Sequence, residues 1–176
     1  MTSTTSATTQ SIQRGLALLV LTCTIACQGG APESQTPDAD VGTAQRPPRG
    51  KAALEAWLAT AQYRSWKCEM MISPPRLNGN HGNQRICSND VLLASDAGAY
   101  PVGAASVKEL FLPDSSPNGF AVGVKIDVGD GPTTWYWYER RGTDTAAAPK
   151  AEGVAVPDCA VCHGLAERDF VYIRAQ

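Results

Sequence analysis

The sequence predicts one α+β domain that is mainly antiparallel β-sheet, with a helix at its N-terminal end and a cysteine-bearing segment at its C-terminal end. Two patterns carry this prediction. Apolar residues recur at helical spacing between residues 51 and 66, and they alternate with small or polar residues between residues 120 and 127. A length of 176 residues suits one domain, and 43% hydrophobic with 18% charged residues is typical of a globular protein.

The expected helix covers residues 51–66. Its apolar positions lie three or four residues apart, so they share one side of a helix. They are Leu54, Trp57, Leu58 and Ala61. Pro47 and Pro48 keep the preceding chain from being helical. We therefore expect one amphipathic helix to open a folded domain that spans residues 51–176.

The expected strands follow the helix. Residues 120–127 alternate as a half-buried strand does, residues 127–132 (DVGDGP) have turn chemistry, and residues 133–140 (TTWYWYER) are rich in aromatic residues. These segments predict a β-hairpin. Residues 105–112 and a shorter piece around Val91 to Leu93 are further strand candidates.

The first 26 residues are typical of a secretory signal peptide. Arg14 is the only charged residue before the apolar stretch of residues 15–26 (GLALLVLTCTIA), which is too short for a permanent membrane anchor. Cys23 lies inside this stretch, so we expect it to be removed with the signal. The prediction is an exported protein of the bacterial periplasm or cell envelope.

The stretch ends in Thr24-Ile25-Ala26-Cys27, with a Gly-Gly pair after Gln28. This segment resembles the lipobox at which bacterial signal peptidase cuts before a cysteine that becomes lipidated, so Cys27 is the candidate lipidation site. Gln28 is not the Asp associated with inner-membrane retention, which favours an anchor in the outer membrane. The alternative is ordinary cleavage near Ala26 or Ala31.

Residues 27–50 are rich in Pro, Gly, Ala and Ser without apolar periodicity, and they predict a flexible tether. Without Arg14 the chain carries 14 basic and 17 acidic residues, and no Lys/Arg cluster is present. This composition argues against nucleic acid as a partner. Contact with a membrane is expected only through the lipid anchor.

The C-terminal segment contains Cys159-Ala-Val-Cys162-His163, the pattern of c-type haem attachment. Thiols at this spacing can add to the two vinyl groups of a haem, and the adjacent imidazole then reaches the iron. We expect one covalently attached haem c, with His163 as the axial iron ligand. Bacterial haem attachment takes place outside the cytoplasmic membrane, which agrees with export.

Two other chemistries compete for this motif, a redox-active dithiol and half of a zinc site. A dithiol enzyme is expected in a βαβ setting near the start of its domain. The sequence has no second cysteine pair at this spacing and no histidine cluster to complete a zinc site. Haem attachment is therefore the favoured interpretation.

Cys68 and Cys87 lie in the polar stretch between the expected helix and the first strand. Thiols of an exported domain tend to oxidise, so we expect a disulfide that closes this loop. The alternative is a reactive thiol or an additional ligand.

The sixth iron position has three candidate ligands. His81 is the only other histidine, and it lies in a Gly/Asn-rich loop (NGNHGNQR) in which histidines are more often surface groups. Met70 and Met71 are the other two, and a His/Met pair would make an electron carrier. Packing in the core is the simpler interpretation of both methionines.

Several separated motifs follow one another along the folded part. They are Tyr63-Arg-Ser-Trp66, Val107-Lys108-Glu109-Leu110, Val124-Lys125, Trp135-Tyr136, CAVCH and Asp169-Phe170-Val171-Tyr172. In this order they resemble the cytochrome P-460 family, which includes the nitric-oxide-binding cytochromes c′-beta. The resemblance implies a cytochrome P-460-like haem domain over residues 51–176, an open iron site, and a sheet that pairs into a homodimer.

The resemblance also gives Lys108 a candidate role. In true P-460 members the lysine of the VKEL motif bonds covalently to a porphyrin meso carbon, and Lys108 is the matching position. Such a crosslink would distort the macrocycle, which is one way in which a protein changes haem reactivity. The alternatives are an ordinary strand lysine, or an uncrosslinked lysine as in the c′-beta branch.

Hydroxylamine-oxidising members of the family place a carboxylate over the distal face of the haem, as a proton acceptor. The strand that should present it, residues 119–124, has no acid, so a base would come from Glu109, Asp127 or elsewhere. This departure predicts an apolar distal pocket, which suits a neutral diatomic ligand such as nitric oxide. Phe111 and Phe120 are candidates to line it, although core packing is the simpler interpretation.

Three functions remain open from the sequence. The first is a haem oxidoreductase that oxidises hydroxylamine or a related nitrogen compound, and the second is a protein that binds nitric oxide without turnover. The third is a six-coordinate electron-transfer cytochrome c that uses His81 or a methionine. A redox partner cytochrome is expected for the first and the third.

Overall fold

A computed structural model describes residues 46–75, 80–172 and 174–175 of the chain. The predicted signal peptide, the lipidation candidate Cys27 and most of the predicted tether lie outside these residues. No helix in the described part of the chain is both long enough and apolar enough to cross a membrane.

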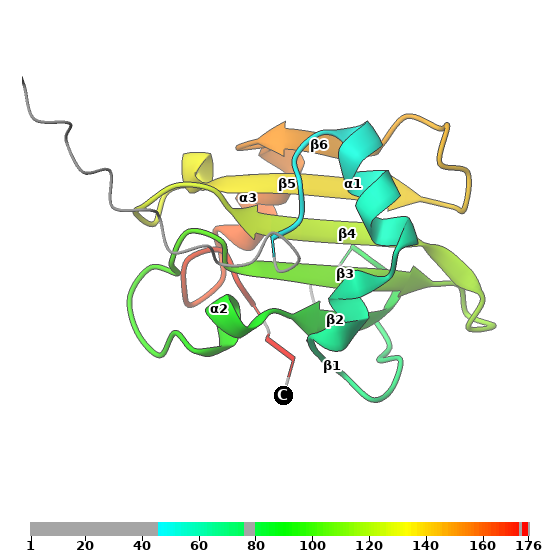
Figure 1. Cartoon of the computed structure of the whole chain (residues 1–176), viewed down its shortest axis with the longest axis horizontal. Helices are drawn as coiled ribbons and strands as arrows, with labels where there is room; N and C mark the ends of the chain where they lie inside the picture. Colours follow the sequence, from blue (N-terminus) through cyan, green and yellow to red (C-terminus); the bar gives the residue numbers. More distant parts are fainter. Residues whose placement is uncertain (1–45, 76–79, 173, 176) are drawn as a thin grey trace, which may run out of the picture. The chain divides into compact units, whose positions relative to one another are not determined.

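The described residues form an α+β fold around a six-stranded antiparallel sheet in which every strand pairs with its neighbours in the sequence (Figure 1). The strands are β1 (Lys67–Cys68), β2 (Asn83–Ser88), β3 (Ala105–Phe111), β4 (Pro117–Lys125), β5 (Trp135–Arg141) and β6 (Ala151–Val154). The hairpin expected from residues 120–140 is confirmed as β4 and β5, with Val122 opposite Tyr138. The strand expected over residues 105–112 is β3.

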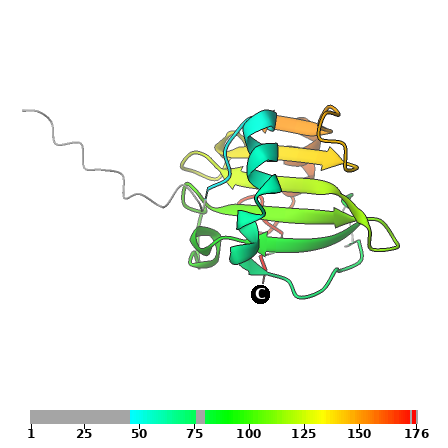
Figure 2. The ribbon, with the colours of Figure 1, turned by 45° about the vertical axis from the view of Figure 1, so that its right-hand side comes forward.

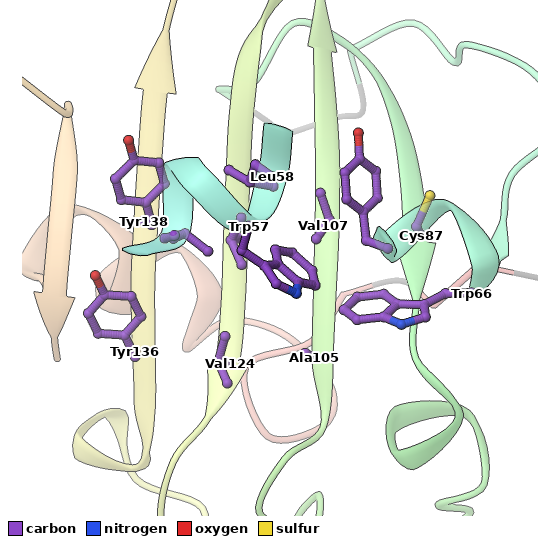
Figure 3. Packing of buried hydrophobic residues seen from close by; sticks show 12 residues of the cluster. Trp57, Leu58, Trp66, Cys87, Ala105, Val107, Val124, Tyr136 and Tyr138 are labelled. Atoms are coloured by element: carbon purple, nitrogen blue, oxygen red, sulfur yellow. The ribbon is translucent and has the colours of Figure 1, made fainter. Parts of the chain in front are cut away.

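Helix α1 (Lys51–Ala59) lies on one face of the sheet, and helix α3 (Pro157–His163) lies on the other (Figures 1 and 2). The α1 side chains Leu54, Trp57 and Leu58 pack against side chains of the sheet. Figure 3 shows Trp57 and Leu58 over the strands. Alternate residues of β3, β4 and β5 belong to this cluster, because every second residue of a strand points to the same face of the sheet. The residues are Ala105, Val107, Val122, Val124, Tyr136 and Tyr138.

Helix α1 is shorter than the helix expected over residues 51–66. Ala61 adopts a left-handed backbone conformation with φ of 53°, which ends the helical path, and a 3-10 turn (Gln62–Ser65) follows. This break allows Tyr63 and Trp66 to turn inward, and both are buried in the cluster beneath α1. Apolar spacing alone does not distinguish this arrangement from a continuous helix.

The strand expected around Val91 to Leu93 is wrong, because these residues belong to the short helix α2 (Asp90–Leu93). Asn89 caps this turn, and its side-chain oxygen accepts a hydrogen bond of 3.0 Å from the backbone N–H of Leu92. The same oxygen accepts a hydrogen bond from the backbone N–H of Ala105. The buried side chain of Asn89 therefore holds both the helical turn and the start of β3. These hydrogen bonds outweigh the preference of Val91 for a strand.

Cys68 and Cys87 form a disulfide bond. The two cysteines lie directly opposite one another on β1 and β2. The bond therefore joins two adjacent strands, rather than closing a loop that precedes the first strand. It fixes the two-residue strand β1 at the edge of the sheet.

We expect Leu54→Ala to lower the free energy of unfolding by about 2–5 kcal/mol, because the fully buried leucine would leave a cavity between α1 and the sheet. Urea denaturation followed by circular dichroism measures the change. Val128→Ala is the control, since Val128 is exposed and its truncation should change stability by less than about 0.5 kcal/mol. Equal losses in the two variants would contradict the assignment of Leu54 to the core.

Candidate functional site

A cavity of about 890 Å³ lies between the sheet and the segment that contains α3. Cys159, Cys162 and His163 all line it. This volume falls in the range of cavities that hold a small-molecule ligand or cofactor. The motif that the sequence singles out therefore lines a cavity large enough for a cofactor and partly open to solvent.

The sheet side of the cavity follows from the same alternation that builds the core beneath α1. On β5, Trp135, Trp137 and Glu139 line the cavity, while the intervening tyrosines belong to the cluster beneath α1. On β3, Ser106 and Lys108 line it. Lys108 thus lies in the wall of the cavity that contains the cysteine pair.

His163 has one ring nitrogen fixed by the backbone. Its Nδ1 lies 2.7 Å from the carbonyl oxygen of Phe170, and a carbonyl oxygen can only accept a hydrogen bond. Burial lowers the pKa of His163 to about 4, so the ring is neutral at pH 7. The neutral ring therefore carries its proton on Nδ1 and leaves the lone pair of Nε2 available to a metal.

Aromatic rings surround His163. The ring centroid of Trp137 is 4.4 Å away, that of Tyr172 is 5.7 Å away and that of His81 is 6.2 Å away. The structure therefore brings the two histidines of the chain into the same cavity. His81 is not the surface group that its Gly/Asn-rich loop predicts.

Cys159 and Cys162 are not joined by a disulfide bond. Burial raises the pKa of Cys159 to about 11, and the negative charges of Glu139 and Asp158 act in the same direction. A redox-active dithiol needs the opposite shift, because its attacking sulfur has to be a thiolate near neutral pH. This environment disfavours the dithiol interpretation. Within the described ranges, no group of three or more His, Cys, Asp or Glu side chains is arranged to hold a metal ion.

Glu139 is the residue of the cavity that the sequence interpretation missed. Its carboxylate is buried, and it lies 3.3 Å from His81 Nδ1 and 2.5 Å from Arg141 Nε. Burial by itself would raise the pKa of Glu139, but His81 and Arg141 outweigh it and hold the pKa at about 2. The alternation of residues 135–139 could have predicted this position, because it puts Glu139 on the same face of the strand as Trp135 and Trp137.

The other candidate acids lie elsewhere. Glu109 points to the α1 face of β3, where it accepts hydrogen bonds from Tyr63 (2.7 Å) and Arg64 (3.0 Å) and pairs with Arg85. Asp127 is exposed on a turn and does not line the cavity. The geometry therefore gives no support to either residue as a base in this site.

Neither candidate phenylalanine lines the cavity. Phe120 packs against the cluster beneath α1, as the simpler interpretation of this residue expects, and Phe111 lines a small pocket of about 190 Å³ that is separate from the cavity. Met70 and Met71 are exposed, so the expectation that they pack in the core is wrong. Neither methionine lines the cavity.

Comparison of the chain with protein-family models, with curated proteins and with solved structures finds no match.

We expect Cys159 of the haem-free protein to react with iodoacetamide about 100-fold more slowly at pH 8 than a thiol of ordinary pKa, because its thiolate fraction is smaller by that factor. Mass spectrometry of the alkylated peptides measures the rate at this residue. The control is the same chain in urea, where burial is lost and the rate should return to the ordinary value. A rate faster than the unfolded control would revive the redox-active dithiol.

Proposed function

We propose that this chain is an exported c-type cytochrome with one haem, which is held by thioether bonds to Cys159 and Cys162 and by His163 at the iron. In this proposal the protein oxidises hydroxylamine or a related small nitrogen compound and passes the electrons to a redox partner cytochrome, or it binds nitric oxide. One observation carries it: Cys159, Cys162 and His163 line one cavity of about 890 Å³, and the hydrogen bond of His163 Nδ1–H to the Phe170 carbonyl leaves Nε2 unprotonated.

The cavity walls fit a large, flat and mostly apolar cofactor. Val161 and Leu165 line the cavity and are 74% and 75% exposed, and the half-exposed Tyr172 lines it as well. Large apolar side chains gathered in an open cavity are typical of a binding site. A haem bound at Cys159 and Cys162 would cover them.

The chain supplies hydrogen-bond acceptors to the same cavity. A bound haem would supply an iron able to coordinate a nitrogen ligand and to accept electrons from it. The ionised carboxylate of Glu139 can accept a hydrogen bond from an N–H or O–H group and orient the ligand. His81, whose pKa is lowered mainly by burial, is a second acceptor and lies 3.3 Å from that carboxylate.

These polar groups change the balance between the functions that the sequence leaves open. The expected apolar pocket suited nitric oxide binding without turnover. A buried carboxylate and an imidazole in the cavity instead favour oxidation, because removing hydrogen from hydroxylamine requires a proton acceptor within reach. Lys108 lines the cavity, as a haem-crosslinking lysine has to, and its crosslink is part of the proposal.

The cellular setting is proposed on separate grounds. The Cys68–Cys87 disulfide suits an oxidising compartment outside the cytoplasm. The signal peptide and lipid anchor at Cys27, a redox partner cytochrome and a homodimer remain proposals from the sequence and its resemblance to the cytochrome P-460 family.

A six-coordinate electron-transfer cytochrome is the second candidate, and one observation favours it. The ring centroids of His81 and His163 are 6.2 Å apart, close enough that both imidazoles could hold one haem iron. The alternative with a methionine loses support, because Met70 is 96% exposed and does not line the cavity.

We expect the full chain, produced with haem-maturation machinery, to carry one haem that survives acid extraction, because thioether bonds are covalent. Replacing both Cys159 and Cys162 by Ala should abolish this retention, and pyridine haemochrome spectra measure it. A wild-type protein without covalent haem would overturn the proposal.

Absorption spectra of the same protein separate the functions. A high-spin spectrum that shifts with hydroxylamine supports the open site, and a red-shifted Soret band that Lys108→Ala returns to an ordinary position supports the crosslink. A low-spin spectrum that becomes high-spin only in His81→Ala supports the electron carrier.

We expect Glu139→Gln to slow hydroxylamine oxidation by about 10²- to 10⁴-fold, because His81 is the proton acceptor in this proposal and the neutral amide no longer stabilises its protonated ring. Steady-state turnover with an artificial electron acceptor measures the effect. Glu109→Gln is the matched control, since Glu109 is a buried glutamate on the opposite face of the sheet and should leave turnover within about threefold. Equal effects would contradict the role of Glu139.

A further inference from the structure

The segment that follows α3 contains an unusual stretch of backbone. Asp169 and Phe170 both have positive φ, 36° and 63°, a region that residues with side chains rarely adopt. Two consecutive residues in such conformations cost free energy, and they persist only where surrounding contacts impose them. The contacts made by Asp169 identify what imposes the conformation here.

The carboxylate of Asp169 is held from several directions. Its oxygens lie 2.9 and 2.8 Å from Lys125 Nζ, and they accept hydrogen bonds from the backbone N–H of Tyr100 (2.6 Å) and from Trp135 Nε1 (3.0 Å). The side chains of Lys125 and Asp169 are 0% and 1% exposed. Donors from three separate parts of the chain, β4, β5 and the loop before β3, therefore fix the position of this buried carboxylate.

Lys125 is itself fixed at the end of β4. Its Nζ also donates to Thr134 Oγ1 (2.8 Å) and to the carbonyl oxygen of Gly129, and it lies over the ring of Trp135. A buried ion pair contributes little net stability compared with apolar residues, because both charges lose their hydration. The pair nonetheless holds Asp169, in the segment that follows the cysteine motif, which indicates a role other than stability.

Phe170 connects the ion pair to His163. Its carbonyl oxygen, one residue beyond Asp169, is the group 2.7 Å from His163 Nδ1. Its side chain packs against the second cluster of the core, beside Trp135 and Trp137. The carbonyl is therefore held on one side by the ion pair and on the other by packing.

We propose that the buried Lys125–Asp169 ion pair is a positioning device for His163: it fixes the left-handed backbone at Asp169 and Phe170 so that the Phe170 carbonyl holds Nδ1–H and directs Nε2 toward the iron. This inference rests on the proposed haem function. Lys125 and Asp169 do not touch the haem site themselves and act through Phe170.

The physical consequence concerns the strength of the ligand. A hydrogen bond from Nδ1–H to a fixed acceptor makes the imidazole more basic, and a more basic ligand stabilises ferric iron over ferrous iron. Loss of the ion pair frees the carbonyl to move, so the Nδ1–H bond weakens. The iron–histidine bond then weakens as well, and the haem becomes easier to reduce.

The test uses the haem-loaded full chain and two variants, Asp169→Asn and Lys125→Met. Each removes one charge of the pair and should raise the midpoint potential by about 59 mV, which is a tenfold change in the ratio of ferrous to ferric haem at a fixed potential. Each should also lower the iron–histidine stretching frequency in resonance Raman spectra of the ferrous protein.

Glu55→Gln is the control for stability alone. Glu55 and Arg140 form another largely buried ion pair, with Oε1 and Nε 2.5 Å apart, on the α1 face of the sheet. This variant should lose comparable stability in urea and leave both haem readouts unchanged. If Asp169→Asn does not fold, Lys125→Arg, which keeps the charge but changes its reach, takes its place in the comparison.

The outcomes separate the two proposals. Absence of covalent haem from the wild-type chain overturns the proposed function and this inference with it. Covalent haem in every variant, with potentials and stretching frequencies no different from those of Glu55→Gln, overturns the inference and leaves the proposed function in place. Shifts confined to the Asp169 and Lys125 variants support it.

Discussion

The alternation of side chains across the sheet is the constraint on which the rest of the structure depends. Each strand residue has to face either α1 or the cavity, and a displacement of one residue would exchange the two sets. On β5 the alternation gives tyrosines to the core beneath α1 and gives Trp135, Trp137 and Glu139 to the cavity. Strand β5 thus contributes both to the core beneath α1 and to the wall of the cavity. Its register with β4 determines which residues face each side.

Local patterns explain what the sequence could predict. The β4–β5 hairpin, the partnership of Cys68 with Cys87 and the grouping of Cys159 with His163 each depend on short stretches or on general chemistry. The meeting of His81 and Glu139 could not be predicted, because it brings together residues 58 positions apart through a loop whose composition indicates solvent exposure. The end of α1 depends on tertiary packing, since Tyr63 and Trp66 are buried only if the helix stops.

Buried charges occur on both faces of the sheet, and they are paired on each. Glu109 is surrounded by Tyr63, Arg64 and Arg85 on the α1 face, and Asp169 is matched by Lys125 beneath the cysteine motif. Such groups add little stability compared with apolar side chains, but they admit few alternative arrangements. The apolar clusters provide most of the driving force for folding, and the paired charges select one arrangement of the loops above them.

The strand order has a consequence for how the chain acquires its structure. Every strand of the sheet pairs with a strand that is adjacent to it in the sequence, so no pairing has to join distant parts of the chain. Topologies dominated by such local contacts fold faster than those that join distant strands. The sheet can therefore form by successive hairpins, and α3 and the segment after it close over a surface that is already complete.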